Sequence, residues 1–332
     1  MAWYETPAAR ALGVRYPLLQ APMSGFTTPE LAAAVSNADA LGSLGAAWLT
    51  PADLRAEIRA VRQLTDRPFM VNLFAWPEPD AAPDAHPALD EQLAVVAEER
   101  VPVFSFTFGI PDFAEVKSAG ATIVGTATTV GEARALEVAG VDVVVTQGWE
   151  AGGHRGTFEI SPAEVEVGSL ALVPQVVDAV SVPVLAAGGI MDGRGIAAAL
   201  ALGAGGASLG TAFLTASESS ASPAFRRLLA ATPAEGTRVS RVYSGREVRL
   251  VRTDVVEELV RLGRPPAPYP LQLDVTRPIH RAGLEADDPS RLFALAGQGT
   301  ALVREAAAAE LVAMLVAETE HAISLLGGDP SG

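Results

Sequence analysis

Short apolar runs alternate with amphipathic segments along most of this chain. Eight of these runs have the continuous hydrophobic character of strands that are buried on both faces. They span residues 17–20, 40–44, 68–74, 101–106, 121–125, 141–147, 182–187 and 207–210. Between them, alanine-rich segments such as 29–37, 51–63, 130–139 and 193–202 have apolar residues at helical spacing. This alternation predicts a (β/α)8 TIM barrel of the α/β class, with an open doubly wound sheet as the alternative.

Three further segments exceed what a minimal barrel needs. Residues 76–89, rich in Pro, Asp and Ala, are expected to form a loop after the third strand. Residues 232–284 contain proline clusters and are expected to form an excursion, or lid, over the barrel mouth, which leaves 1–231 and 285–332 for the barrel. Residues 289–326 are expected to form one or two C-terminal packing helices, with Leu311, Leu315 and Ile323 at helical spacing.

Composition narrows the class of function. The formal net charge of −15 argues against nucleic acid as a partner, because phosphate binding needs clustered Lys and Arg. The chain has no cysteine, so disulfides and thiolate nucleophiles are excluded. Its four histidines are scattered, so no metal centre is expected. No run of about 18 apolar residues and no leader-like N-terminus is present, which favours a cytoplasmic protein without membrane contact.

In a barrel of this kind, chemistry lies at the C-terminal ends of the strands. The seventh and eighth strands end in Gly188-Gly189 and in Ser208-Leu209-Gly210-Thr211. Such glycine-rich ends match the common phosphate site of barrels, where backbone amides and a helix N-terminus hold the anion. Alternatively, the glycines only permit tight turns between strand and helix.

The other strand ends carry residues that suit a flat ring system. Ala21, Pro22 and Met23 follow the first strand, Asn72 closes the third, Thr126 ends the fifth and Gln147 ends the sixth. Amide side chains can hydrogen-bond the edge of an isoalloxazine ring, although they can equally satisfy nearby backbone groups, and Met23 can be core filler. After Gln147 come Gly152, Gly153 and His154. Bare glycine backbone beside an imidazole predicts a cofactor surface with a reactive group over it.

Several of these segments together resemble the nitronate monooxygenases, formerly called 2-nitropropane dioxygenases, and in particular their bacterial class I branch. The resemblance is carried by residues 20–25, 29–37, 125–129, 150–158 and 187–195, and it resumes at 268–272 and 296–299. It covers most of the chain in the expected order.

This resemblance implies FMN bound in a barrel without a metal. By family analogy, Asn72, Gln147 and Gly152 contact the ring, while Gly189 and the turn 208–211 hold the phosphate. The implied reaction is oxidation of an alkyl nitronate, such as propionate 3-nitronate, by O2 to a carbonyl compound and nitrite. His154 aligns with the family's active-site histidine, which would bind the nitro oxygens or remove a proton from a neutral nitroalkane.

The resemblance leaves the substrate open. Tyr269 is expected to close the substrate pocket, and Arg277 either supplies a cation for a carboxylate-bearing nitronate or is a solvated surface charge. Trp149 places a bulky ring within the motif, where it would narrow the pocket or stack near the cofactor. Asp39 stands where a small residue such as glycine is expected, and residues 247–250 depart from the Ala-Arg-Gly pattern common among relatives.

Two other functions stay open from the sequence. The first is a reductase of a related FMN barrel family, either an NAD(P)H:quinone reductase or a flavin-type enoyl-acyl carrier protein reductase. The second is a non-catalytic flavin-binding protein. The expected partners are a small nitronate or nitroalkane and O2. Either a monomer or a homodimer fits the sequence.

Overall fold

The computed structural model describes residues 2–75, 89–158 and 165–326 of the 332-residue chain. The predicted loop at 76–89 therefore lies outside the described residues, apart from Leu89.

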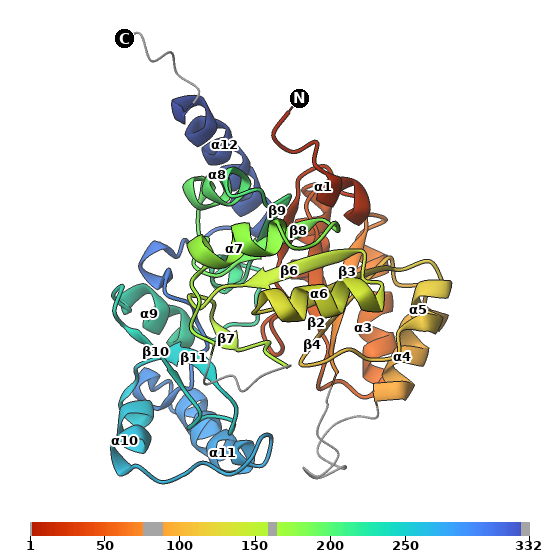
Figure 1. Ribbon diagram of the computed structural model, residues 1–332. Helices are drawn as coiled ribbons and strands as arrows, with labels where there is room; N and C mark the ends of the chain where they lie inside the picture. The colour runs from red at the N-terminus through yellow and green to blue at the C-terminus, as the bar shows by residue number, and fades with distance from the viewer. Residues whose placement is uncertain (1, 76–88, 159–164, 327–332) are drawn as a thin grey trace.

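Eight parallel strands form the centre of the molecule (Figure 1). They are β1 (Leu18–Gln20), β2 (Gly42–Gly45), β3 (Phe69–Phe74), β4 (Val103–Thr107), β5 (Thr122–Ala127), β6 (Val143–Gln147), β8 (Val184–Ala187) and β9 (Gly206–Leu209). Their order in the sheet is β1-β9-β8-β6-β5-β4-β3-β2. A parallel bridge between Leu19 and Leu41 joins β1 to the start of β2 and closes the sheet. The fold is a (β/α)8 TIM barrel, and the eight predicted strands are confirmed.

Helices cover the outside of this barrel (Figure 1). Those of the barrel region are α1 (Pro7–Leu12), α2 (Pro29–Asn37), α3 (Pro51–Leu64), α4 (Leu89–Glu98), α5 (Ala114–Ser118), α6 (Val130–Ala139), α7 (Ser169–Val177), α8 (Gly193–Ala201) and α9 (Pro223–Ala231). Local sequence fixes where several of them begin. Thr28, Thr50 and Ser222 each cap a helix with the side-chain oxygen, and a proline follows each cap.

The barrel is filled by apolar side chains from its strands and is capped at its N-terminal end by α1. Leu19, Met70, Val103, Val124 and Leu185 lie in one buried cluster with residues of α1. Thr6 at the start of α1 donates through its hydroxyl to the Gly205 carbonyl, which ties the helix to β9. The interior is therefore a packed core, and in barrels of this kind the active site lies at the opposite end.

Asp39 shows why a glycine is expected at its position. Its φ is 64°, in the left-handed region that favours glycine, and Asp and Asn tolerate this region better than most residues. Its carbonyl accepts hydrogen bonds from the amides of Arg15 and Tyr16, and its carboxylate pairs with Arg67 at 3.2 Å. The departure at Asp39 is a turn far from the barrel mouth.

Residues 232–284 form more than a loop. They contain β10 (Thr237–Ser240), β11 (Val248–Val251), α10 (Asp254–Leu262) and most of α11 (Gln272–Glu285). Strand β11 pairs antiparallel with β10 on one side and with β7 (Gly153–His154) on the other. A second sheet therefore joins this segment to the loop that follows β6, and residues 248–250 are part of it while Glu247 directly precedes it.

The C-terminal part contains two short 3-10 helices, η4 (Pro289–Arg291) and η5 (Thr300–Leu302), before one long helix, α12 (Ala308–Leu326). Leu311 and Leu315 of α12 are buried in a cluster that includes Ile196 of α8 and Leu31 of α2. Among the described residues, no helix has the length and apolar character needed to cross a membrane.

Candidate active site

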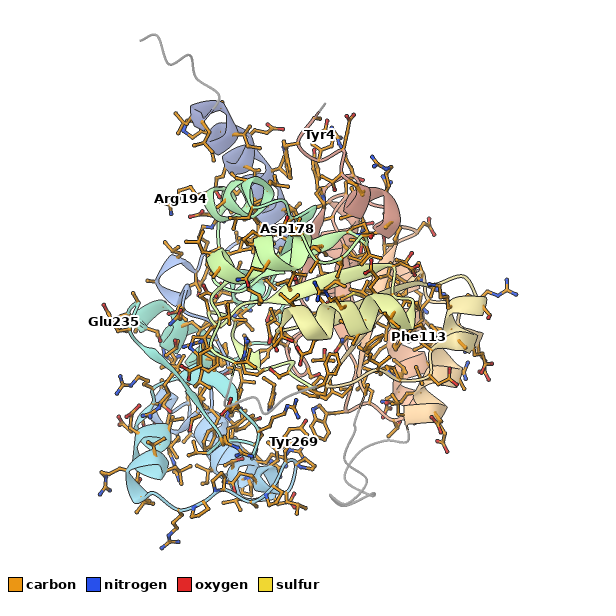
Figure 2. All side chains as sticks on the ribbon, in the orientation of Figure 1. Tyr4, Phe113, Asp178, Arg194, Glu235 and Tyr269 are labelled. Carbon is orange, nitrogen blue, oxygen red and sulfur yellow. The ribbon has the colours of Figure 1, made fainter. Side chains whose placement is uncertain are left out.

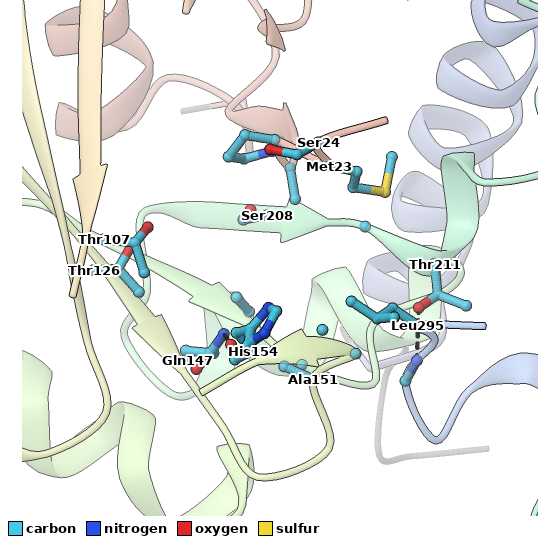
Figure 3. A pocket seen from close by; sticks show the side chains of 18 of the residues that line it. Met23, Ser24, Thr107, Thr126, Gln147, Ala151, His154, Ser208, Thr211 and Leu295 are labelled. Carbon is cyan, nitrogen blue, oxygen red and sulfur yellow. Dashed lines mark hydrogen bonds between the residues drawn. The ribbon is translucent and has the colours of Figure 1, made fainter. Parts of the chain in front are cut away.

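A cavity of about 260 Å³ lies at the C-terminal ends of the barrel strands. In Figure 3, Met23 and Ser24 lie on one side of it, and Gln147, Ala151 and His154 on the other. Of the residues predicted to surround a cofactor, those that line the cavity are Ala21, Pro22, Met23, Asn72, Thr126, Gln147, Gly152, Gly153, Gly188, Gly189, Ser208, Gly210 and Thr211. The strand ends therefore converge on one site, as the barrel geometry requires.

Leu209 is the exception within this set. Its side chain is 1% exposed and packs into the cluster between the barrel and its outer helices. Side chains alternate along a strand, so Ser208 and Gly210 face the cavity while Leu209 faces the opposite way. Only the backbone of Leu209 is near the mouth, where its carbonyl accepts the Ala21 amide.

At the ends of β8 and β9, glycines leave the cavity wall formed by backbone without side chains. Gly188 and Gly189 have φ values of 112° and 72°, which a side chain would strain. A Cβ built on Gly210 would stand 3.6 Å from Ala21 Cβ and 3.7 Å from Met23 Sδ, both on residues of the cavity wall. Gly152 has a different reason to be glycine, because its Cβ would lie 2.4 Å from the Gly297 nitrogen.

Gln147 holds the chain that follows it. Its Nε2 donates to the His154 carbonyl at 3.0 Å, and its Oε1 accepts from the Gly156 amide at 2.9 Å. Asn72 is 3% exposed and donates through Nδ2 to Ser105 Oγ at 2.9 Å. Both amides therefore line the cavity and also hydrogen-bond to protein groups. Hydrogen bonds to nearby protein groups do not prevent these side chains from facing a bound molecule.

His154 is placed by the second sheet. It pairs with Val248 of β11, and its Nε2 lies 2.8 Å from Ser244 Oγ. Burial, followed by the charge of Arg246, lowers the pKa of His154 from its ordinary 6.5 to about 3. The imidazole is therefore neutral at physiological pH.

Aromatic rings surround this imidazole. The ring centroids of Tyr269, Phe108 and Tyr243 lie 5.5, 5.9 and 6.3 Å from that of His154. Trp48 extends the group, with its centroid 6.5 Å from that of Tyr269. The histidine thus has an apolar setting, which accounts for the direction of its pKa shift.

Three arginines brace the His154 loop, defined here as residues 147–158. Arg155 is fully buried and donates to the Gly148 carbonyl at 2.7 Å and to the Gln147 carbonyl at 3.3 Å. Arg249 of β11 donates to the Trp149 carbonyl at 2.9 Å. Arg246 donates to the carbonyl of Thr157. The loop is held by its own Arg155 and by Arg246 and Arg249, which reach it from a distant part of the sequence.

The carboxylate of Glu132 fixes the far end of this loop. It is fully buried and accepts the Phe158 amide at 2.6 Å and the Thr128 hydroxyl at 2.8 Å. The Thr128 hydroxyl also lies 2.7 Å from that of Thr157. Hydrogen-bonded networks of this kind hold a buried loop in one conformation.

The three residues expected to touch substrate have different environments. Arg277 of α11 lines the cavity, and its guanidinium carbon lies 4.8 Å from the centroid of Trp48. Tyr269, labelled in Figure 2, lies just before α11, is 5% exposed and packs beside His154, but it is not itself a cavity-lining residue. Trp149 is not a cavity-lining residue. Its ring lies beneath Arg155 and Arg249, at 5.2 and 5.6 Å, so the expectation that it narrows the pocket is wrong.

Sequence reasoning missed several residues of this site. Trp48, Phe108, Tyr243 and Leu273 line the cavity, and Ser244 contacts the histidine. Trp48 and Phe108 follow β2 and β4, so a reading of those two strand ends would have found them. Tyr243 and Ser244 come from residues 232–284, where the sequence alone carries no signal for proximity to His154. No group of three or more possible metal ligands occurs among the described residues.

Comparison with known proteins places this site in a family. A family model for nitronate monooxygenase matches residues 6–318. A probable nitronate monooxygenase from Staphylococcus haemolyticus (strain JCSC1435) is 38% identical, with 98% of this chain and 99% of that protein covered. A second, from Staphylococcus aureus (strain Newman), is also 38% identical, with 90% and 93% covered.

Solved structures agree with the sequence comparisons. The nitroalkane oxidase from Streptomyces ansochromogenes superposes with a TM-score of 0.89 at 39% identity, covering 97% of this chain and all of that one. FabK from Thermotoga maritima gives a TM-score of 0.84 at 32% identity, covering 98% and 99%. The match runs through the barrel, the His154 loop and the segment that carries Tyr243 and Arg277, and the chain belongs to the nitronate monooxygenase family.

Proposed function

We propose that this protein is an FMN-dependent nitronate monooxygenase, which oxidises alkyl nitronates of the propionate 3-nitronate type with O2 to a carbonyl compound and nitrite. One observation carries the proposal. The glycine-rich ends of β8 and β9 and the neutral His154 lie on the walls of one cavity at the barrel mouth. Oxidative detoxification of reactive nitro compounds is the role that we propose for this activity.

The cavity fits FMN on its chemistry. A Cβ at Gly153 would meet no atom within 4 Å and one at Gly210 makes only ordinary contacts, so the glycines leave room on the wall. Gly188, Gly189 and the turn from Ser208 to Thr211 would hold the phosphate, with Leu209 contributing backbone only. The short helix Thr211–Phe213 begins at this turn, where backbone N–H groups suit an anion.

The flavin ring would lie toward the side of the cavity formed by Asn72, Gln147 and Gly152. Among the described residues, Nε2 of Gln147 makes a single hydrogen bond, so its second hydrogen is available to a ring acceptor. When bound, FMN supplies the electron-accepting chemistry of the reaction, which no side chain of this chain can supply.

The protein side of the reaction is binding and exclusion of water. A neutral His154 offers a hydrogen bond to the nitro oxygens without the strong salt dependence of a cation. Phe108 and Tyr243 line the cavity and would give the reacting carbon an apolar setting, and Tyr269 packs against His154. Arg277 stands on the same cavity and would pair with a carboxylate on the substrate. In this proposal, residues 232–284 act as the lid over the substrate.

The test combines an oxygen electrode with a nitrite assay on the FMN-loaded protein. Propionate 3-nitronate should cause O2 uptake and nitrite release, and under anaerobic conditions it should bleach the flavin absorbance. NADH and NADPH should not bleach it. His154→Ala should lower kcat/KM for the nitronate by about 100-fold, a usual scale for loss of a group that acts on the reacting atoms.

Two results would overturn the proposal. The first is rapid anaerobic bleaching by NADH or NADPH with turnover of a quinone or an enoyl thioester and no nitrite from any nitronate. The related NAD(P)H:quinone reductases and enoyl-acyl carrier protein reductases make these pyridine nucleotides the necessary comparison. The second is unchanged turnover in His154→Ala with every substrate, which would remove the histidine from the reaction.

A further inference from the structure

Ser244 is the polar side chain that contacts the imidazole of His154. It is fully buried, and its Oγ lies 2.8 Å from His154 Nε2 although the two residues are 90 positions apart in the sequence. Among the described residues, no protein group hydrogen-bonds to Nδ1 of His154. Because His154 lines the cavity, Nδ1 is the ring nitrogen that is left for a bound molecule.

Independent contacts hold Ser244 in this place. The carbonyl of the preceding Tyr243 accepts the Thr276 hydroxyl at 2.7 Å. Gly245, which follows, has a φ of 89°, and a Cβ there would lie 2.2 Å from the Ala267 carbonyl oxygen. On the other side of the contact, His154 is fixed by its pairing with Val248. Serine and histidine are therefore brought together by the backbone rather than by their own attraction.

The distances indicate where the serine proton lies. Two acceptors are near the hydroxyl, His154 Nε2 at 2.8 Å and the Arg246 carbonyl at 3.3 Å. Hydrogen bonds from O–H donors fall between about 2.5 and 3.0 Å and those from N–H donors between about 2.7 and 3.2 Å, so the 2.8 Å separation fits either direction and the choice depends on the acceptors within reach of the hydroxyl. The 3.3 Å contact is too long for an O–H donor, and the 2.8 Å contact suits one. The Arg246 amide, also 3.3 Å from Oγ, approaches the hydroxyl as a donor.

We propose that Ser244 is a positioning residue whose hydroxyl donates a hydrogen bond to Nε2 of His154. This bond fixes the neutral tautomer of the imidazole, in which the ring proton is on Nδ1. The imidazole then presents an N–H to the cavity, which is the polarity that an anionic oxygen needs. It presents no lone pair there, so it cannot take a proton directly from a neutral carbon acid. The kinetic part of this inference rests on the proposed function, while the tautomer itself does not.

Nitrogen NMR of the histidine rings tests the tautomer without any turnover. The chain has four histidines, so a sample of the FMN-loaded protein labelled with ¹⁵N in histidine gives few ring signals, and His154→Asn assigns the relevant one. We expect Nδ1 of His154 to have the shift of a protonated nitrogen and Nε2 that of an unprotonated one. The reverse pattern in the wild-type protein would overturn the proposal, whether or not any variant folds.

Substitution of the serine tests its role. In Ser244→Ala the ring should lose its fixed form and move toward the Nε2–H tautomer that free histidine prefers, while Ser244→Thr, which keeps a hydroxyl, should retain the wild-type pattern. Ser240→Ala, at the end of β10 and without contact to His154, is the matched control and should change nothing. An unchanged ring pattern in Ser244→Ala would exclude the serine as the cause.

Turnover should change in a specific direction. With a preformed nitronate, Ser244→Ala should lower kcat/KM about three- to tenfold, the scale of one neutral hydrogen bond. With the neutral nitroalkane the loss should be smaller, because the variant ring can expose a lone pair to the cavity. A larger loss with the nitroalkane would contradict the assigned polarity. Absence of all nitrite release would instead count against the proposed function and leave the NMR result standing.

Discussion

Arg277 places a positive charge on the wall of an otherwise apolar part of the cavity. Its guanidinium stacks over Trp48, and the structure assigns it no ion pair among the described residues. A carboxylate on the substrate would gain a charge-assisted hydrogen bond there, worth about 1.5–3 kcal/mol. Arg277→Gln should therefore raise the KM for propionate 3-nitronate roughly 10- to 100-fold. Initial rates over a range of substrate concentrations measure this.

Selectivity is the decisive part of that prediction. For a nitronate of similar size without a carboxylate, such as propyl-1-nitronate, the KM should rise less than about threefold in Arg277→Gln. The nitro group of this substrate binds away from Arg277. Arg281→Gln, on the exposed face of the same helix, removes an equal charge and should leave both KM values unchanged. An equal rise in KM for the two nitronates in Arg277→Gln would show that this arginine does not bind the carboxylate.

For single residues, the sequence predicts which positions lie at the cavity better than it predicts where their side chains point. Asn72, Gln147 and Ser208 line the cavity because strand ends converge at one end of any barrel of this type. Trp149 lies only two residues beyond Gln147, yet its ring packs on Arg155 and Arg249. The direction of a side chain in a loop depends on partners distant in sequence, so strand alternation cannot supply it.

The sheet formed by β7, β10 and β11 is the element that connects the histidine to residues 232–284. Its turn contains Gly245, whose φ is 89° and whose missing Cβ would stand 2.2 Å from the Ala267 oxygen and 2.6 Å from the Tyr269 nitrogen. Gly245→Ala should therefore destabilise the protein by about 2–4 kcal/mol and displace Ser244 from His154. Urea unfolding followed by circular dichroism measures the first effect, and nitrite release measures the second.

Gly263 provides the matched comparison for this substitution. It ends α10 with a φ of 62°, but a Cβ there would meet no atom within 4 Å. Gly263→Ala should cost about 1 kcal/mol from backbone strain alone and keep full activity. Equal losses of stability and of activity in the two variants would contradict this prediction. They would show that close packing of the Gly245 turn against residues 267–269 does not hold the turn in place.

This sheet also marks the limit of sequence reasoning at the scale of elements. Eight barrel strands are recognisable because each is a continuous apolar run between helical segments. Strand β7 has two residues, Gly153 and His154, and no hydrophobic pattern. Its partner Val248 is 94 positions from His154 and lies in the segment 232–284, for which the sequence predicts an excursion but no particular strand. Pairing across that distance is set by the tertiary fold, which also brings Tyr243, Leu273 and Arg277 of this segment to the cavity wall.

For the whole molecule, the neutral state of His154 links the site to stability in acid. Its pKa is about 3 when folded, against an ordinary value of 6.5. Between these values the unfolded chain binds a proton that the folded protein does not bind. The free energy of unfolding must therefore fall as pH falls from 6.5, by at most about 1.4 kcal/mol per pH unit from this residue. The contribution is fully present above pH 6.5 and decreases below it.

His154→Gln isolates this contribution, since glutamine cannot take up the proton. Other groups also respond to acid, including His280, whose pKa is lowered by burial, so the variant must be compared with wild type at each pH. The stability of wild type relative to His154→Gln should decrease by about 1–2 kcal/mol between pH 6.5 and pH 5, measured by urea unfolding. His321→Gln, at an exposed position of α12, should follow the wild-type curve. If the difference between wild type and His154→Gln stays constant over this range, His154 titrates with the same pKa in the folded and unfolded states, and burial does not keep its imidazole neutral.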